Sequence, residues 1–373
     1  QIELLPFDHK PLGLNLIYGL FGYLIKYGHG QSLIIAIFFN SLITIVSYRL
    51  ISPLLDHEKI KSYQIFIALI IFLVTFQAPF VGFSGNSETL ANFFILVSLY
   101  LLFNALKGNN KILILSSGFI AVLSLSINFL SLVILSLPTL FLLTQFTKEK
   151  ILSFSIYLSG IIIGLLLLTL LYTKLGDPKY YFYDLYDFYQ VYGDRTQEER
   201  LKSFLYFFRS LIIFVPILIA SIYFLRKLNN RLTILVYTLT LWTLSAFMAC
   251  LVSGNDLVHY VSFLVAPLVI ISTILSLNFD LQKRLLVFFV PIFFCSTYMA
   301  TEIYDNYRKF NFFQLVMPSM DQLSEVIKDE KLLSIQSGHV PFYLSEIKPT
   351  QKYLFPQNAN FFEGSNEDEY WLT

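Results

Sequence analysis

The stretch Phe7-Asp8-His9-Lys10-Pro11-Leu12 marks the point at which this chain changes from polar to apolar. It places a carboxylate, an imidazole and an ammonium group on three consecutive residues, which a proline follows. From there to Thr301 the sequence is a series of long apolar runs separated by short polar segments. Charged groups at the edge of a hydrocarbon layer are costly and usually functional, so this stretch is the first candidate site.

The composition excludes a water-soluble fold. Of the 373 residues, 56% are hydrophobic and 14% are charged, whereas soluble domains carry about 25% charged residues. No soluble core encloses so much apolar surface, so lipid is expected to surround most of the chain. The net charge of +1 gives no reason to expect nucleic acid as a partner. Cys250 and Cys295 both lie inside apolar runs, so no disulfide framework is expected.

The apolar runs predict an all-α polytopic membrane protein, because about 20 apolar residues make one spanning helix. Residues 12–27 form a shorter run, for which we expect a helix lying at the membrane interface, with a tilted crossing as the alternative. The run 112–146 is long enough for two short spans, which we separate at the polar residue Asn128. Ten crossings are predicted in all: 33–50, 64–80, 89–106, two within 112–146, 151–172, 204–225, 232–252, 257–277 and 285–301.

The composition becomes that of a soluble protein after residue 304. We therefore predict a membrane domain over residues 1–304 and a small α/β extracytoplasmic domain over residues 305–373. The chain opens on Gln1 without an initiator methionine, and we expect it to be a piece of a longer protein at both ends.

Lysine and arginine in short loops predict the orientation, because such loops stay in the cytoplasm. The basic loops alternate along the chain so that they share one face: 49–61, 107–111, 148–150, 226–231 and 283–284. The opposite face is then predicted to collect the carboxylates and histidines: residues 8–10, 86–88, the bend at Asn128, the loop 174–202, residues 253–259 and the C-terminal domain.

Two candidate groups on that outer face carry acids. Lys10 is suited to bind a phosphate, and Asp8, with His9 beside it, is suited to take a proton from a hydroxyl. The alternative is that these residues cap the next helix while Lys10 extends toward lipid headgroups. Glu88 starts a span on the same face, and Asn86, two residues before it, is a candidate substrate-binding residue. It is either a second carboxylate of one cavity or an acid that the helix macrodipole favours at an N-terminus.

A third group lies at the start of a later span. Asp256 and His259 are three residues apart and share a helix face, with Tyr260 next to them. They are suited to bind a ligand anion or a divalent metal, or else they form a helix cap and an interfacial histidine. A zinc site usually needs three or four ligands, so the pair is an incomplete metal site. The tyrosines of residues 180–192 predict an aromatic belt at the membrane surface or a surface that stacks on sugars.

The chain resembles the GT-C class of membrane glycosyltransferases, in particular the bacterial relatives of protein O-mannosyltransferases and aminoarabinose transferases. Residues 8–12 followed by Gly19-Leu20-Phe21-Gly22 are similar to the family's D-x-K-P-P-L segment and the l-F-G that follows it. Residues 86–90 are similar to the family's helix that starts with an acidic residue. His259-Tyr260, followed by Pro267-Leu268, is similar to the family's span that contains H-Y and then l-P-l. Residues 342–356 are similar to a feature of the bacterial soluble tail.

The resemblance implies an inverting transfer of a sugar from a polyprenyl-phosphate carrier to an acceptor outside the cytoplasm, at the bacterial inner membrane. It implies that Lys10 lies near the donor phosphate, that Glu88 is the acid heading the later span, and that His259 and Tyr260 bind substrate. The chain departs from the family at Leu12, where the motif has a second proline. The family's catalytic aspartate lies on an earlier loop, for which Asp8 is the counterpart here, apart from Glu3.

Two other functions compete with this prediction. A non-catalytic subunit of a larger membrane complex fits the departure in the catalytic loop. A secondary transporter is less favoured, because the hydropathy pattern shows no internal repeat and the ionisable groups lie at one face rather than at the midplane.

Overall fold

The computed structural model describes residues 12–25, 31–55, 60–77, 86–146, 149–175, 196–224, 230–253, 258–298 and 300–301. The chain divides into two compact units, and the larger comprises residues 12–168 and 195–299. The smaller unit is formed by residues 1–11, 169–194 and 300–373, most of which lie outside the described residues. The predictions for Asp8, His9, Lys10, Asp256, the tyrosine-rich loop and the C-terminal domain fall on residues that are not described. The following paragraphs concern the larger unit.

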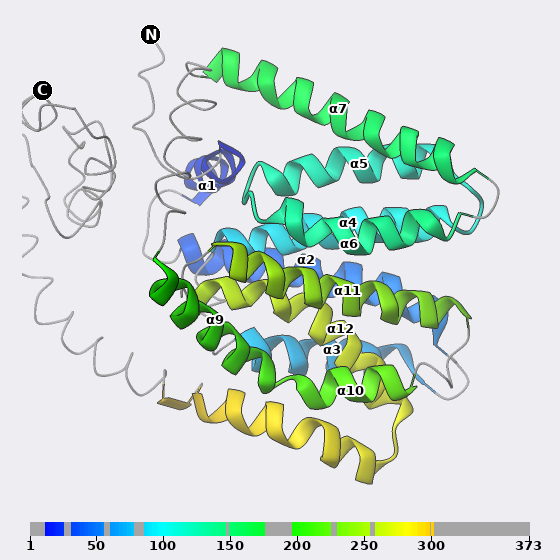
Figure 1. The fold of residues 1–373 in the computed structure, drawn as a ribbon, viewed down its shortest axis with the longest axis vertical. Coiled ribbons are helices and arrows are strands. Elements are labelled where there is room, and N and C mark those ends of the chain that lie inside the picture. The colour runs from blue at the N-terminus through cyan, green and yellow to red at the C-terminus, as the bar shows by residue number, and fades with distance from the viewer. Residues whose placement is uncertain are drawn as a thin grey trace, which may run out of the picture. The chain divides into compact units, whose positions relative to one another are not determined.

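The described residues form helices and no strand (Figure 1). The short 3-10 helices are η1 (Ser52–Leu54) and η5 (Val258–Val261), and a last helix spans Leu281–Tyr298. The α-helices are α1 (Leu12–Ile25), α2 (Gln31–Ile51), α3 (Ser62–Gln77), α4 (Ser87–Ala105), α5 (Lys111–Leu125), α6 (Ser131–Thr144), α7 (Lys150–Leu175), α9 (Gln197–Ile212), α10 (Val215–Phe224), α11 (Asn230–Ser253) and α12 (Ser262–Asn278).

The described part of the chain is that of an all-α, multi-pass membrane protein, as the composition predicted. Six of the described helices are long and apolar enough to cross a membrane, and α9 with α10 makes a seventh if that bent pair is one span. Three further apolar helices, α3, α5 and α6, are shorter. A helix lies at each of the ten predicted places, and the number that cross the bilayer remains a prediction. The predicted break at Asn128 is confirmed, because α5 ends at Leu125 and α6 begins at Ser131.

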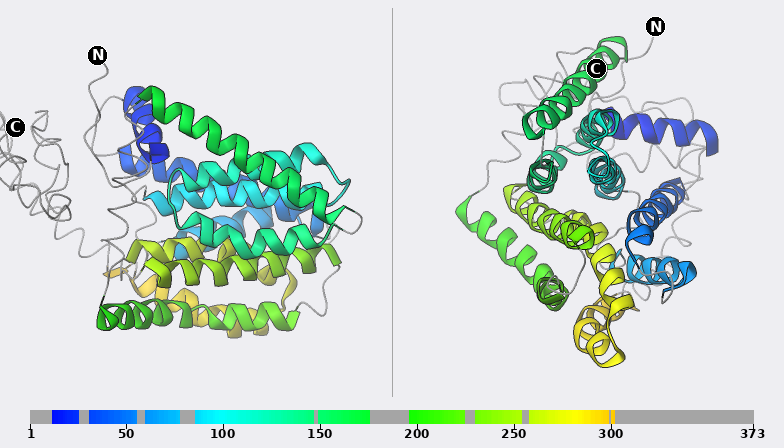
Figure 2. Two further views of the ribbon diagram at one scale, coloured as in Figure 1. Left: turned by 45° about the horizontal axis from the view of Figure 1, so that its top comes forward. Right: turned by 90° about the vertical axis from the view of Figure 1, so that its right-hand side faces the viewer.

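Helix α1 runs across the bundle. In Figure 1 it is seen almost end-on while the other helices run from side to side, and in the right-hand view of Figure 2, which looks along the bundle, it is seen from its side. A helix perpendicular to the spanning helices lies in the plane of the membrane surface. This course favours the predicted interfacial helix over a tilted crossing.

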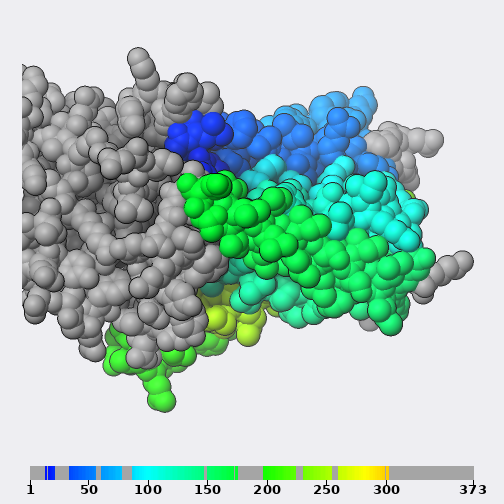
Figure 3. Space-filling model, turned by 90° about the horizontal axis from the view of Figure 1, so that it is seen from above, coloured from blue at the N-terminus to red at the C-terminus, as the bar shows by residue number. Residues whose placement is uncertain are grey.

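Helices α12 and α7 occupy opposite environments in the bundle. Of the apolar stretch that includes α12, 89% is buried, and every residue from Ser262 to Leu275 is buried. Only 22% of the apolar stretch of α7 is buried, and the space-filling view shows this helix on the outside, beside α5 (Figure 3). Leucine and isoleucine side chains of α7 are therefore exposed to lipid, whereas those of α12 form the centre of the core.

The region of α9 and α10 differs from the prediction. The loop was expected to run to residue 202 and one span to cover 204–225, but α9 already begins at Gln197. Thr196 caps it through a capping box, in which its hydroxyl accepts a hydrogen bond from the Glu199 N–H and the Glu199 carboxylate accepts one from the Thr196 N–H. The chain then bends by 56° before α10, at whose second residue Pro216 has no N–H to continue the α9 ladder.

Glycines let α5 and α7 approach closely. A Cβ atom built on Gly118 would lie 2.1 Å from the Tyr157 carbonyl oxygen, and one on Gly160 would lie 2.1 Å from the Leu115 carbonyl oxygen. A Cβ on Gly164 would lie 2.9 Å from the Val122 side chain. Gly160 and Gly164 form a G-x-x-x-G pattern, by which membrane helices bring their backbones together. The sequence analysis missed this pattern, although the spacing of the two glycines indicates it.

Two of the basic loops, 107–111 and 148–150, contact each other at one end of the bundle. The amide of Asn109 donates a hydrogen bond of 2.9 Å to the Glu149 carboxylate, which Lys111 also approaches at 3.8 Å. At the start of the last helix, the Lys283 ammonium and N–H donate to Asp280, and they lower the pKa of that exposed carboxyl. The membrane face of this end, cytoplasmic or outer, remains a prediction.

Candidate functional site

Glu88 lies in the first turn of α4, at the end of the bundle opposite the basic loops. Asn86 is the N-cap residue, and its carbonyl oxygen accepts hydrogen bonds from the N–H groups of Thr89 and Leu90. The Asn86 side chain makes no capping bond, so its predicted place at the helix start is confirmed and its substrate-binding role remains untested. The first turn of a helix favours a negative charge, because its N–H groups point toward it.

The Glu88 side chain is completely buried, with an exposed fraction of 0%. Its Oε1 accepts hydrogen bonds from the Ser87 hydroxyl at 2.9 Å and from the Asn128 amide at 3.0 Å. The Asn128 amide also donates to Ser87 Oγ at 3.1 Å, so the three side chains close a small ring. Its Oε2 has no hydrogen-bond partner, and none of the ion pairs among the described residues involves Glu88.

Asn92 continues the same face of α4 one turn further along. Its amide donates a hydrogen bond of 2.7 Å to the Ser262 carbonyl oxygen at the start of α12. Its Oδ1 is buried and has no partner. A buried acceptor without a donor destabilises a protein by about 1–3 kcal/mol, so two of them on one helix face point to a group that both acceptors are there to bind.

Tyr260 and His259 lie at the same end, in η5 before α12. The Cys250 thiol at the end of α11 donates to the Tyr260 carbonyl oxygen at 3.4 Å, and it lies within electrostatic range of the Glu88 carboxylate. The ring of His259 packs edge-on against that of Tyr260, with centroids 4.9 Å apart. Tyr260 is buried, whereas His259 is only partly buried.

These contacts bring segments that are distant in the sequence into one group, which we call the Glu88 cluster: Ser87, Glu88, Asn92, Asn128, Cys250, Tyr260 and Ser262. The prediction that residues 86–88, the bend at Asn128 and His259 share one face is confirmed. Sequence reasoning missed Asn92 and Cys250 as members. The spacing of four residues between Glu88 and Asn92, both polar inside an apolar span, was the available signal for Asn92.

The start of α1 docks beside this cluster. The Gly13 N–H donates a hydrogen bond of 2.8 Å to the Ser126 carbonyl oxygen, two residues before Asn128. The contact therefore joins the beginning of α1 to the turn that also supplies the partner of Glu88.

Replacing Gly13 by Ala is expected to loosen α1. A Cβ atom there would lie 2.3 Å from Ser126 Oγ and 2.6 Å from the Ser126 carbonyl oxygen, so the helix has to move away and lose its hydrogen bond. Hydrogen–deuterium exchange of the α1 amides measures this loss, which we expect to be about tenfold faster exchange. Gly19→Ala is the matched control on the same helix, because nothing lies within 4 Å of a Cβ atom at that position. Equal exchange in the two variants would contradict the docking role of Gly13.

A divalent metal does not fit the described part of the site. No three His, Cys, Asp or Glu side chains among the described residues are close enough together to hold one. The group that fits Glu88 Oε2 and Asn92 Oδ1 is a hydrogen-bond donor, such as a hydroxyl or an amine. Comparison with family models, with curated proteins and with solved structures finds no match to this chain.

Proposed function

We propose that this protein is a glycosyltransferase of the bacterial inner membrane, which moves a sugar from a polyprenyl-phosphate carrier to a hydroxyl group of an acceptor outside the cytoplasm. The observation that carries the proposal is the buried Glu88 carboxylate, whose Oε2 has no partner. A carboxylate held in this way within hydrogen-bond reach of a hydroxyl is the arrangement of a general base. The lysines and arginines in the loops at the other end of the bundle support the outer face for this end.

In the proposed reaction, the acceptor hydroxyl donates a hydrogen bond to Glu88 Oε2. The hydroxyl oxygen forms a bond to the anomeric carbon of the sugar while its proton passes to the carboxylate. The bond from that carbon to the carrier phosphate oxygen breaks, and the phosphate leaves with the electron pair. Asn92 Oδ1 accepts from a second donor of the acceptor or the sugar and fixes its orientation.

The segment before α1 supplies the donor side of the proposal. Lys10 pairs with the carrier phosphate as its negative charge develops, and His9 lies beside it in the sequence. Asp8 is a second candidate base, and His259 with Tyr260 completes the substrate-binding surface. The polyprenyl chain of the carrier stays in the bilayer, so the sugar is delivered at the membrane surface.

Replacing Lys10 by Ala tests the donor side. The purified protein is placed in nanodiscs with a panel of polyprenyl-phosphate-linked sugars, and the release of polyprenyl phosphate is measured. Loss of a cation that stabilises a leaving phosphate is expected to slow turnover by about a hundredfold. Lys283→Ala, at the basic end of the bundle, is the control and is expected to leave turnover unchanged. If Lys10→Ala keeps its full rate and its melting temperature, Lys10 does not bind the donor phosphate.

The competing proposal is a non-catalytic subunit of a larger membrane complex. The complete burial of Glu88 favours it, because a substrate reaches this side chain only when the surrounding helices move apart. In that case the bonds from Ser87 and Asn128 make Glu88 a lock between α4 and the α5–α6 turn. The subunit function predicts no carrier release by the purified chain with any donor of the panel, and a stable partner that co-purifies with it from the membrane.

A further inference from the structure

A second polar feature lies in a cavity between α5, α6 and α7. The cavity has a volume of about 290 Å³ and is lined by thirteen side chains, none of them charged. Leucine, isoleucine, valine, alanine and phenylalanine side chains make up the wall, and the only polar groups are the hydroxyls of Ser136, Thr139 and Tyr157. A mostly apolar cavity of this size with a few placed polar groups is the usual form of a small-molecule site.

Thr139 has a buried hydroxyl that makes no hydrogen bond within its own helix. Serine and threonine in apolar helices normally donate to a carbonyl oxygen of their own helix, as Thr243 does to Leu239 and Thr273 to Val269. Ser136, on the same wall of the cavity, donates to the Val133 carbonyl oxygen at 2.6 Å. Thr139 Oγ1 makes no such bond to a carbonyl oxygen of its own helix; its polar neighbour is the Tyr157 hydroxyl, and the side chain is only 5% exposed.

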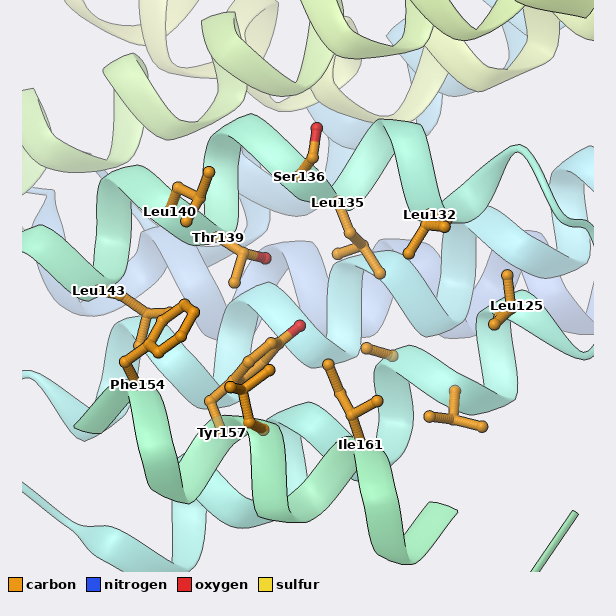
Figure 4. A pocket seen from close by; sticks show the side chains of 13 residues that line it. Leu125, Leu132, Leu135, Ser136, Thr139, Leu140, Leu143, Phe154, Tyr157 and Ile161 are labelled. Carbon is orange, nitrogen blue, oxygen red and sulfur yellow. The ribbon is translucent and has the colours of Figure 1, made fainter. Parts of the chain in front are cut away.

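The Tyr157 hydroxyl is directed to the same place. Figure 4 shows the side chain of Tyr157 pointing from α7 toward α6, on which Thr139 lies. The two hydroxyls are near neighbours, and the tyrosine is 6% exposed. Two buried hydroxyl groups that converge at the inner wall of an apolar cavity are a pair of hydrogen-bond donors for one acceptor atom.

The cavity opens sideways toward the bilayer. Leu132 and Leu140, which line it, have exposed fractions of 65% and 50% and belong to the apolar outer surface. Thr139 is the eighth residue after Ser131 along α6, which is about 12 Å from the helix start. That depth approaches the middle of a hydrocarbon layer about 30 Å thick. A phospholipid holds its ester carbonyl groups at the interface, so only its hydrocarbon reaches this level.

We propose that the cavity between α5, α6 and α7 binds an apolar, membrane-dissolved molecule that carries a carbonyl oxygen, which accepts hydrogen bonds from Thr139 and Tyr157. The carbonyl oxygen has two lone pairs and therefore satisfies both hydroxyls at once. The hydrocarbon part of the ligand lies against the leucine side chains of α6. The molecule enters from the bilayer between α6 and α7 and not through the Glu88 cluster, so this site is independent of the proposed glycosyl transfer.

The test compares two photoreactive probes in nanodiscs. One is a long-chain methyl ketone with a terminal diazirine, and the other is the same chain without the carbonyl group. After illumination, the labelled peptides of the full chain are mapped by mass spectrometry. We expect the ketone to label α6 and α7 around Thr139 about tenfold more strongly than the hydrocarbon, because a site built to donate hydrogen bonds discriminates against a ligand that cannot accept them.

Three variants make the test specific. Thr139→Val keeps the shape of the side chain and is expected to reduce ketone labelling to the level of the hydrocarbon probe. Ser136→Ala removes a hydroxyl of the same cavity that is already bonded to its own helix, and it is expected to change nothing. Ala121→Leu fills the cavity and is expected to reduce labelling by both probes.

Two results would overturn the proposal. One is equal labelling by ketone and hydrocarbon, which would mean that bilayer hydrocarbon alone occupies the cavity. The other is ketone labelling that Thr139→Val leaves unchanged while the melting temperature shows the variant to be folded.

Discussion

Replacing Glu88 by Gln is expected to lower the rate of sugar transfer by about a hundredfold or more while the protein stays folded. The amide oxygen of Gln still accepts the hydrogen bonds from Ser87 and Asn128, so the ring of three side chains is kept. The change replaces Oε2, the acceptor without a partner, by an NH₂ group that cannot take a proton. Turnover of a polyprenyl-phosphate-linked sugar and the melting temperature are measured on the same preparation.

Two further variants separate catalysis from stability at this position. Glu88→Ala removes the acceptor for the buried Ser87 hydroxyl and the partly buried Asn128 amide, and it is expected to destabilise the protein by about 1–3 kcal/mol, besides abolishing transfer. Asp280→Asn changes an exposed carboxylate at the basic end of the bundle and is expected to leave the rate unchanged. A Glu88→Gln variant that transfers sugar at the full rate would remove Glu88 from the reaction and leave it as a structural lock.

Replacing Gly160 by Ala is expected to destabilise the packing of α7 by about 3 kcal/mol, at the upper end of the usual cost of overpacking. The added Cβ atom would lie 2.1 Å from the Leu115 carbonyl oxygen and 3.0 Å from the Phe119 nitrogen. Both are backbone atoms of α5, so no side-chain rotation relieves the contact. The free energy of unfolding is measured in mixed micelles with increasing denaturing detergent. Gly108→Ala is the control, because a Cβ atom there meets nothing within 4 Å.

Gly164 provides an internal comparison for this prediction. Its added Cβ atom would meet the side chain of Val122 at 2.9 Å, so the double substitution Gly164→Ala with Val122→Ala is expected to recover part of the lost stability. No truncation of an α5 side chain is expected to rescue Gly160→Ala, because its contacts are with the backbone. Rescue of Gly160→Ala by a side-chain truncation, or a loss below about 0.5 kcal/mol, would refute the close approach of α5 and α7.

Several local features were readable from the sequence because their causes are local. Apolar runs predicted the helices, and Asn128 predicted the turn between α5 and α6. The start of α9 also has a local sequence signal, the capping box of Thr196 and Glu199. The polar composition around it nevertheless led to the prediction of a loop. The bend before α10 was missed in the same region, although Pro216 interrupts the apolar run.

The position of each helix in the bundle could not be predicted from the sequence. Helices α7 and α12 are almost equally apolar, yet 22% of the first and 89% of the second is buried. In water, apolar periodicity shows which face of a helix points to the core. In a bilayer, lipid and protein interior are both apolar, so an apolar side chain does not indicate whether it faces lipid or the protein core.

The sequence by itself determined that this is a multi-pass helical membrane protein, because hydropathy acts residue by residue. Only the tertiary structure decided that Glu88 is held by Asn128, 40 residues away, and that Asn92 is bonded to Ser262, 170 residues away. It alone also decided that one oxygen of each acceptor side chain stays without a partner. Those facts depend on which helices are neighbours and on their rotation, and both are set by small and polar residues in contact across the bundle.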